Sequence, residues 1–392
     1  MNLGIKRIYL DNASSTPIDK VVLLAMYKNQ LNNFANPSAI HKQGVLVKKI
    51  INNARESIAN ILNAHSDEII FTGNGTESDN LAIRGIINNY TKQNRLHIIT
   101  TNIEHSAVLR TCQKLETDEV EVSYIQVGTN GIVDSKLIKN VLKENTKIVS
   151  IIYANNEIGT IQPIQEIAKI IRYHRKIYKT ETPFFHIDAT QAINYLDINV
   201  NKLGVDLMTF NGSKIYGPKG IGVLYKRRGV MLEPILFGGG QENKLRSGTE
   251  NVSGIIGISE ALKICERKKD MEVRRLKELQ SYFISELEKK FPRIILNGDL
   301  NKRLPNIINI SIPNIDSELL VIELDAKGIA VSSESACKSN DRHEGSYVVK
   351  ALRPDDKNYG NIRFSMGRFT TKKQIIYTLK SLGQILKKYN VL

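Results

Sequence analysis

The sequence predicts an α/β protein with a large domain built on a mainly parallel sheet flanked by helices, followed by a smaller α+β domain. Two observations predict this. Between residues 65 and 225, short β-rich apolar runs alternate with amphipathic segments, as in βαβ units. After Gly254 the pattern changes to one long charged helix and then to short strands. The chain of 392 residues is long enough for two or three domains of about 150 residues each.

Seven runs are expected to be strands of the large sheet, because each is rich in β-branched or aromatic residues and is bounded by polar or turn-forming residues. They are 68–71, 96–100, 120–127, 147–154, 184–188, 205–210 and 221–226. Helices are expected between them, at 107–116, at 135–143 behind a predicted N-cap at Asp134, and at 163–175 after an opening proline.

The smaller domain is expected to begin near residue 262, inside a helix over 255–290. Short strands around 294–298 and 307–312, a helix near 317–328 and a last helix follow. The apolar faces of the two long helices are predicted from Leu276, Leu279, Phe283 and Leu287, and from Ile375, Leu379, Leu382 and Leu386. We therefore predict an N-terminal segment 1–16 that packs with the small domain, a large domain 17–261 and a small domain 262–392.

The composition is that of an ordinary globular protein, with 41% hydrophobic and 24% charged residues. The apolar runs are too short to span a bilayer, and the N-terminus lacks the apolar region of a secretory signal, so we expect a cytoplasmic protein with no membrane contact. Cys112, Cys265 and Cys337 are far apart and form no CxxC pair, which argues against a disulfide framework and against a zinc site. No metal is expected.

The net charge of +15 leaves two interpretations open. It reflects either a compositional preference for lysine, since the basic residues are scattered, or contact with a tRNA or an acidic acceptor protein. Direct binding of nucleic acid is therefore uncertain from the sequence.

Polar side chains gather where the predicted strands end, which is where open α/β sheets bind ligands. A turn with Gly75 and Thr76 follows the first strand and opens a helix, whose N–H groups and hydroxyl would suit a phosphate. The side chains that follow later strands are His105, Asn156, Asp188, Gln191 and Lys214.

This set meets the needs of pyridoxal 5'-phosphate (PLP), which takes a lysine Schiff base at its aldehyde, a carboxylate at its ring nitrogen and a helix N-terminus at its phosphate. Lys214 lies among glycines in TFNGSKIYGPKG, residues 209–220, and could instead be a surface lysine on a tight turn. Asp188 could be a cap and His105 a polar helix start. Their joint placement at the strand ends favours the cofactor site.

Eleven blocks spread over nearly the whole chain resemble the class V aminotransferase-like PLP enzymes, and among them the cysteine desulfurases of the NifS and IscS type. The blocks are YLDNASSTP (9–17), NPSAIH (36–41), GTESDNLAI (75–83), EHSAV (104–108), NNEIG (155–159), HIDATQ (186–191), KIYGPKGIG (214–222), FGGGQE (237–242), RSGTEN (246–251), SSESAC (332–337) and IRFSMGRFT (362–370). The resemblance implies a fold-type I homodimer with active sites at the subunit interface.

The resemblance also implies a role for each matching residue. Lys214 would hold the cofactor and carry the proton at the substrate Cα, Asp188 would pair with the pyridinium, and Arg363 would clamp the substrate carboxylate. The other implied contacts are His105 stacked on the ring, Gln191 at the ring hydroxyl, Asn156 at the cofactor or substrate carboxylate, Gly75 and Thr76 at the phosphate, and Thr249 reaching the phosphate from the neighbouring subunit.

By the same resemblance, Cys337 would be the nucleophile that takes sulfur from L-cysteine, leaving L-alanine and an enzyme persulfide. It lies in SSESACKSNDRHEGS, a run of small and polar residues suited to a loop that moves between the cofactor and an acceptor. The acceptor would be an iron–sulfur scaffold or a tRNA-thiolating enzyme. Cys112 and Cys265 lie in predicted helices and are expected to be structural.

Two departures from the family pattern leave alternatives open. Asn211 and Ser213 replace a serine and a histidine that normally help bind the phosphate, although both can still form hydrogen bonds. Glu334 stands where glycine is common. A selenocysteine lyase, which shares the fold, and a catalytically weak scaffold homologue are the alternative functions.

Overall fold

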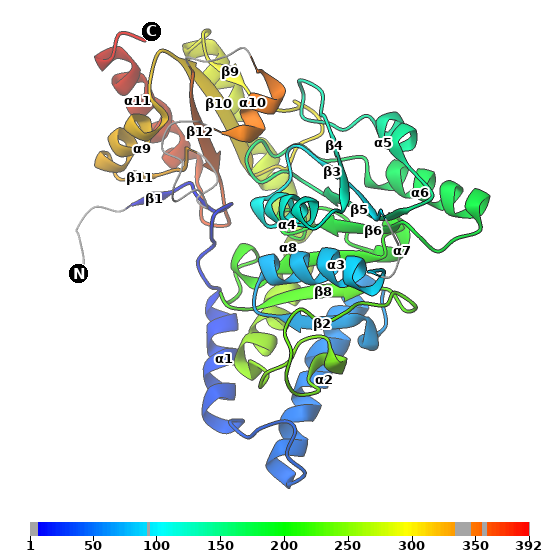
Figure 1. The fold of residues 1–392 in the computed structure, drawn as a ribbon. Coiled ribbons are helices and arrows are strands. Elements are labelled where there is room, and N and C mark those ends of the chain that lie inside the picture. Colours follow the sequence, from blue (N-terminus) through cyan, green and yellow to red (C-terminus); the bar gives the residue numbers. More distant parts are fainter. Residues whose placement is uncertain (1–6, 92–94, 334–345, 355–358, 392) are drawn as a thin grey trace.

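The computed structural model describes residues 7–91, 95–333, 346–354 and 359–391. Figure 1 shows two parts, a larger one around a central sheet and a smaller one around a short sheet near the C-terminus, with helix α8 (Val252–Lys290) reaching into both. Cys337 and Glu334 lie outside the described residues.

The central sheet has seven strands in the order β2-β8-β7-β6-β5-β3-β4. They are β2 (Ile69–Thr72), β8 (Gly222–Lys226), β7 (Leu207–Asn211), β6 (Phe184–Asp188), β5 (Thr146–Ile152), β3 (His97–Thr101) and β4 (Glu121–Ile125). Strand β8 is antiparallel to both neighbours, and the other pairings are parallel. The predicted mainly parallel sheet is confirmed, and each of its seven predicted strands is present with ends within two residues of the prediction.

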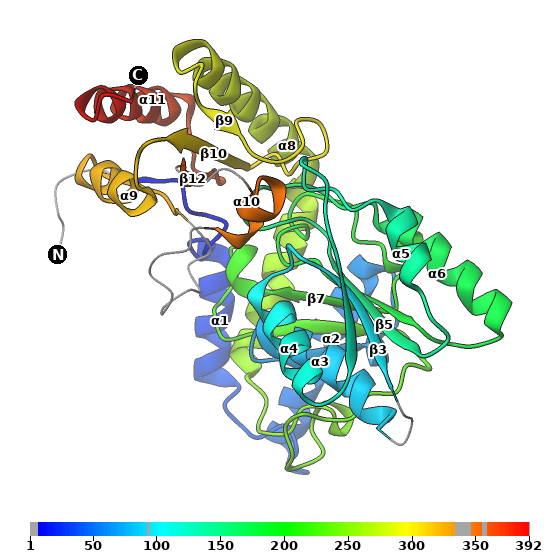
Figure 2. The same cartoon turned by 45° about the horizontal axis from the view of Figure 1, so that its top comes forward.

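Helices cover both faces of this sheet, because successive side chains of a strand point to opposite faces. The face with Ile98, Ile148 and Phe184 packs against α3 (Gly75–Asn89) and α4 (Ser106–Thr117), which lie side by side in Figure 2. The face with Ile99, Val149 and Phe185 packs against α2 (Lys42–Leu62), α5 (Ser135–Val141), α6 (Ile164–Tyr178) and the first part of α8. Both faces are therefore buried, as a parallel sheet requires.

The predicted helix starts are borne out locally. The Asp134 side chain accepts a hydrogen bond from the backbone N–H of Lys136 at 2.9 Å and caps α5, and Pro163 stands directly before α6. The short helix α7 (Val200–Leu203) precedes β7. Helix α1 (Lys20–Asn32) was not predicted, and Val22 is the residue it buries.

The smaller part contains an antiparallel sheet of β12 (Tyr359–Ser365), β10 (Ile307–Pro313) and β9 (Ile295–Leu296). Around it lie α9 (Ser317–Ala326), α10 (Tyr347–Leu352), α11 (Lys372–Lys388) and the second half of α8. Strand β1 (Ile8–Tyr9) pairs with β11 (Ile329–Ala330). The residues predicted to form the apolar faces of α8 and α11 are in this core, with Leu279 only partly buried.

Helix α8 contributes to both hydrophobic cores. Its residues up to Cys265 pack in the core of the large sheet, and those from Leu276 onward pack in the core of the small one. The predicted boundary at residue 262 falls inside this helix, and the division into 1–16, 17–261 and 262–392 stays a prediction. None of the helices in the described part of the chain has the length and apolar content needed to cross a membrane.

Candidate active site

A cavity of about 200 Å³ lies at the carboxyl ends of the parallel strands. Nine residues singled out from the sequence line it, namely Gly75, Thr76, His105, Asn156, Asp188, Gln191, Asn211, Lys214 and Arg363. Ser14, Asn74, Asp79, Ile152, Ala154 and Thr190 complete the lining. Among the other predicted residues, Ser213 and Thr249 are not part of this lining, and Cys337 lies outside the described residues.

Lys214 is held close to backbone by the turn that follows β7. A Cβ at Gly212 would stand 2.4 Å from the carbonyl oxygen of Pro218, so only glycine lets the chain fold back this tightly. The side chain of Asn194 donates to the Lys214 carbonyl at 2.6 Å, and Lys214 Nζ donates to the carbonyl of Ser14 inside the cavity. The crowded segment therefore fixes the lysine in the site rather than on the surface.

The N-terminus of α3 forms one end of the cavity. Asn74 caps the helix by accepting from the N–H of Glu77 at 2.9 Å, and Gly75 and Thr76 follow it at the cavity. Asn211 lies against this turn, because a Cβ on Gly75 would be 2.9 Å from its Nδ2. Ser213 donates to Asn211 Oδ1 at 2.9 Å, so it orients the Asn211 amide from outside the lining. This end offers hydrogen-bond donors to an anion.

Asp188 and His105 line another part of the cavity. Asp188 ends β6, is 4% exposed, and accepts from the N–H of Thr190 at 2.9 Å. His105 caps α4, and its Nδ1 accepts from the N–H of Ala107 at 3.2 Å, which fixes the imidazole ring. Side-chain atoms of Asp79, His105 and Asp188 lie within 4.8 Å of one another. Three side chains this close could bind a metal ion, although no metal site is expected from the sequence.

Arg363 enters the cavity from β12 of the small sheet and is 2% exposed. Its Nη1 donates to the carbonyl of Asn156 at 2.9 Å, and its Nη2 donates to Asp11 Oδ1 at 2.8 Å and to Ser14 Oγ at 2.6 Å. Its Nε is buried and has no hydrogen-bond partner among the described residues. An anionic group in the cavity would satisfy it.

The N-terminal segment completes the site in a way the sequence did not reveal. Asp11 and Ser14 orient Arg363, and Gln191 Nε2 donates to the carbonyl of Ala13 at 2.9 Å. Asp11 lies 352 residues from Arg363 along the chain, so no local pattern links them. Asp79 was also missed, because in the sequence it looks like an ordinary polar position of α3.

Comparisons with known proteins agree with this geometry. Residues 8–377 match the model of the aminotransferase class-V family. A protein named cysteine desulfurase IscS from Dictyoglomus turgidum is 44% identical, over 98% of this chain and 95% of its own. A solved NifS-like protein superposes with a TM-score of 0.89 at 34% identity, covering 97% of this chain and 100% of its own. A structure described as SspA in complex with cysteine has a TM-score of 0.76 at 30% identity and covers 93% and 100%.

The family model spans nearly the whole chain, and the relatives are matched over almost their full length. The resemblance drawn from the sequence motifs is thereby confirmed. This chain belongs to the aminotransferase class-V family and, within it, to the NifS/IscS-type cysteine desulfurases.

Proposed function

We propose that this protein is a PLP-dependent cysteine desulfurase that converts L-cysteine to L-alanine and holds the released sulfur as a persulfide on Cys337. The observation that carries the proposal is the meeting of Lys214, Asp188 and Arg363 in one cavity, since each comes from a different segment of the chain. A similar solved structure is described as a complex with cysteine, which supports this substrate.

The donors of the cavity fit PLP. Gly75, Thr76 and Asn211 would hold the phosphate, Asp188 would pair with the ring nitrogen, and Lys214 would bind the aldehyde. Asn156 Oδ1 is buried without a partner among the described residues, as expected of an atom that awaits a ligand. His105 and Gln191 would contact the ring face and the ring hydroxyl. When bound, PLP supplies an electron sink that stabilises negative charge at the substrate Cα.

The chain itself supplies binding, proton transfer and the nucleophile. Arg363 would bind the substrate carboxylate through a fork that Asp11 and Ser14 already orient. Lys214 would carry the proton at the substrate Cα. The Cys337 thiol would attack the substrate sulfur, so that an S–S bond forms, the C–S bond breaks and the carbon takes up a proton. One thiol and one cysteine give one persulfide and one alanine, so the step needs no external oxidant.

Sulfur would then pass to an acceptor protein, an iron–sulfur scaffold or a tRNA-thiolating enzyme. Ser346 and Tyr347, which follow Cys337 in sequence, are hydrogen-bonded to residues next to the cavity lining. Ser346 donates to the buried carboxylate of Glu157, and Tyr347 donates to the carbonyl of Glu104. The described chain that follows Cys337 in sequence thus starts next to residues of the site, which supports Cys337 as the nucleophile. The cytoplasmic location belongs to this proposal, since both suggested acceptors act inside the cell.

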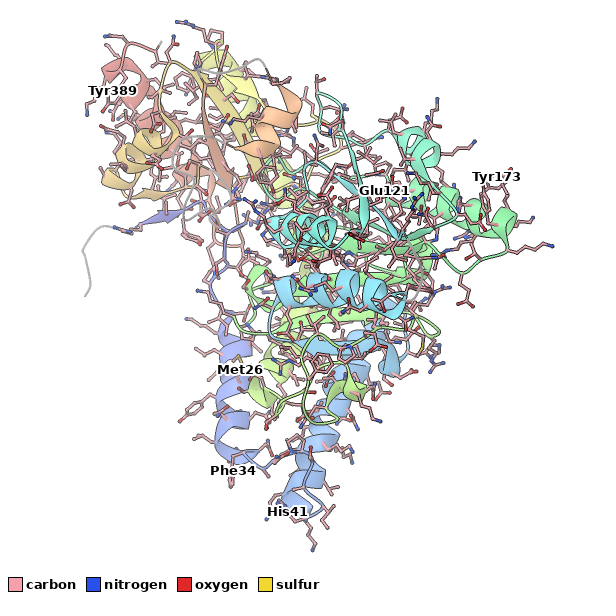
Figure 3. All side chains as sticks on the ribbon, in the orientation of Figure 1. Met26, Phe34, His41, Glu121, Tyr173 and Tyr389 are labelled. Carbon is pink, nitrogen blue, oxygen red and sulfur yellow. The ribbon has the colours of Figure 1, made fainter. Side chains whose placement is uncertain are left out.

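A homodimer is part of the proposal. Helix α1 carries exposed apolar side chains, among them Leu24, Tyr27 and Leu31, and Figure 3 shows Phe34 just beyond the end of this helix. Tyr27 is 61% and Phe34 82% exposed, which is unusual for aromatic side chains unless another surface covers them. Thr249 is exposed outside the cavity and is the residue expected to act in the partner's site. Leu24→Glu on α1 should make the protein monomeric, as measured by analytical ultracentrifugation. A variant that remains dimeric would contradict an interface on α1.

The first experiment is an assay of the purified protein with PLP, L-cysteine and a thiol reductant, in which sulfide and alanine are measured together. Equal amounts are expected from the parent protein. Cys337→Ala should lose nearly all sulfide release, whereas Cys112→Ala, which removes a thiol buried in the core, should retain it. PLP bound without either product would contradict the proposed activity. A parallel assay with selenocysteine separates the lyase alternative by relative rate.

A further inference from the structure

A chain of buried polar side chains crosses the central sheet beneath the cavity. Ser150 on β5, His186 on β6 and Thr209 on β7 are fully buried. His186 Nδ1 lies 2.8 Å from Ser150 Oγ, and its Nε2 lies 3.1 Å from Thr209 Oγ1. The carboxyl oxygen Oδ1 of Asp79 lies 3.6 Å from the same Nε2 atom of His186. The chain therefore ends on Asp79, a residue of α3 that lines the cavity.

Asp79 lies beside the carboxylate that would pair with the ring nitrogen. Side-chain oxygens of Asp79 and Asp188 are within 4.8 Å of one another, and the two residues are 1% and 4% exposed. Asp79 Oδ1 is buried and has no hydrogen-bond partner in the described part of the chain. Two ionised carboxylates this close, and this poorly hydrated, would repel each other.

The titratable groups that face Asp79 come from several elements and are Asp188, His186, Glu104 and His105. Burial raises the pKa of Asp79 well above its usual range, and the charge of Asp188 raises it further. Burial lowers the pKa of His186 to about 3, so this imidazole is neutral at pH 7. Glu104, whose charge would also act on Asp79, has its own pKa raised to about 8 by burial. His105 faces the same space from α4.

We propose that Asp79 is a positioning residue for Asp188, and that the two carboxyl groups form an acid pair with one negative charge and the proton on Asp79. The negative charge then lies on the Asp188 side, where the N–H of Thr190 donates at 2.9 Å and the ring nitrogen of bound PLP would face it, while neutral Asp79 lies beside His186 at the end of the polar chain. The inference rests on the proposed PLP binding. It adds to that function a residue that sets the charge at the pyridine end of the site.

The test compares Asp79→Asn with Asp79→Ala in the PLP-loaded protein, with Asp188→Asn as the matched control. Infrared difference spectra at pH 7 report whether a protonated or an ionised carboxyl group is lost. The absorbance of bound PLP is titrated with pH, and the dissociation constant of PLP is measured. These readouts separate a role in charge from a role in folding, which the melting temperature of each cofactor-free variant reports.

Asp79→Asn should lose a protonated carboxyl band and keep the PLP dissociation constant within about twofold, because a neutral amide replaces a neutral acid. Asp79→Ala should weaken PLP binding about tenfold, because water that enters the emptied space would weaken the attraction between Asp188 and the ring nitrogen. Asp188→Asn should lose an ionised carboxylate band instead.

Loss of an ionised band from Asp79→Asn, or a shifted absorbance titration in that variant, would overturn the acid pair. So would an Asp79→Ala variant with parental PLP affinity and titration, because Asp79 would then be structural only. If Asp79→Ala fails to fold, the infrared band lost from Asp79→Asn still shows whether Asp79 is protonated in the parent. A parent protein that binds no PLP would refute the proposed function instead, and the infrared comparison without cofactor would still report the proton on Asp79.

Discussion

Gly75→Ala is expected to weaken PLP binding without destabilising the protein. Gly75 opens α3, and a Cβ there would lie 2.9 Å from Asn211 Nδ2 and 3.5 Å from Thr190 Oγ1. The Asn211 amide is the end of a side chain and can move aside, but it then leaves the position in which Ser213 donates to its oxygen at 2.9 Å. The added methyl group therefore displaces the amide that is proposed to contact the phosphate.

The magnitude follows from the bond at risk. A hydrogen bond to a charged group contributes roughly 1.5–3 kcal/mol, which corresponds to about a 10- to 150-fold weaker dissociation constant for PLP. The fold itself loses little, because the atom that must move is the end of a side chain and not backbone. The cofactor-free variant should thus melt close to the parent while binding PLP more weakly.

Gly85→Ala in the same helix is the matched control. Its Cβ would lie 3.0 Å from the carbonyl oxygen of Glu233, and neither residue lines the cavity. We expect the opposite pattern, a lower melting temperature with unchanged PLP affinity. Fluorescence titration with PLP and thermal unfolding of both variants check this. Parental affinity in Gly75→Ala would refute the assignment of Gly75 and Asn211 to the phosphate.

Two further predictions concern the buried charges. Arg363→Lys should lower kcat/KM for L-cysteine about 10- to 100-fold, mainly through KM. The reason is that one ammonium group cannot reproduce the guanidinium contacts with Asn156, Asp11 and Ser14. An unchanged KM in steady-state kinetics would contradict the role of Arg363 in binding the substrate carboxylate. Glu104 has its pKa raised to about 8 by burial, so the protonated form stabilises the fold below the unfolded pKa and this contribution is lost as the pH rises through 8. Glu104→Gln should therefore melt at a higher temperature than the parent at pH 9 and at a similar temperature at pH 5. Melting temperatures that change equally with pH in both proteins would contradict this reasoning.

Much of the fold could be predicted because its signals are local. A strand such as 184–188 is a short apolar run, and the Asp134 cap acts on a backbone group two residues away. Lys214 and Asp188 could also be placed, because parallel strands bring their carboxyl ends to one edge. Helix α1 was missed because it buries so little that its apolar residues form no clear inward face. The hydrogen bond from Ser213 to Asn211 could not be predicted, since only the folded turn shows which atom Ser213 reaches, and its contact with the phosphate stays a prediction.

The sequence by itself determined the parallel sheet, the residues at its strand ends and the family to which the chain belongs. Periodicity and contiguous motifs can be recognised in the sequence, because they involve residues that are close together along the chain. The tertiary structure alone decided how the distant pieces meet. It brought Asp11 and Ser14 to Arg363 and set Asp79 next to Asp188. These contacts depend on the packing of two sheets and on the burial of charge. Neither is encoded in the spacing of residues along a chain.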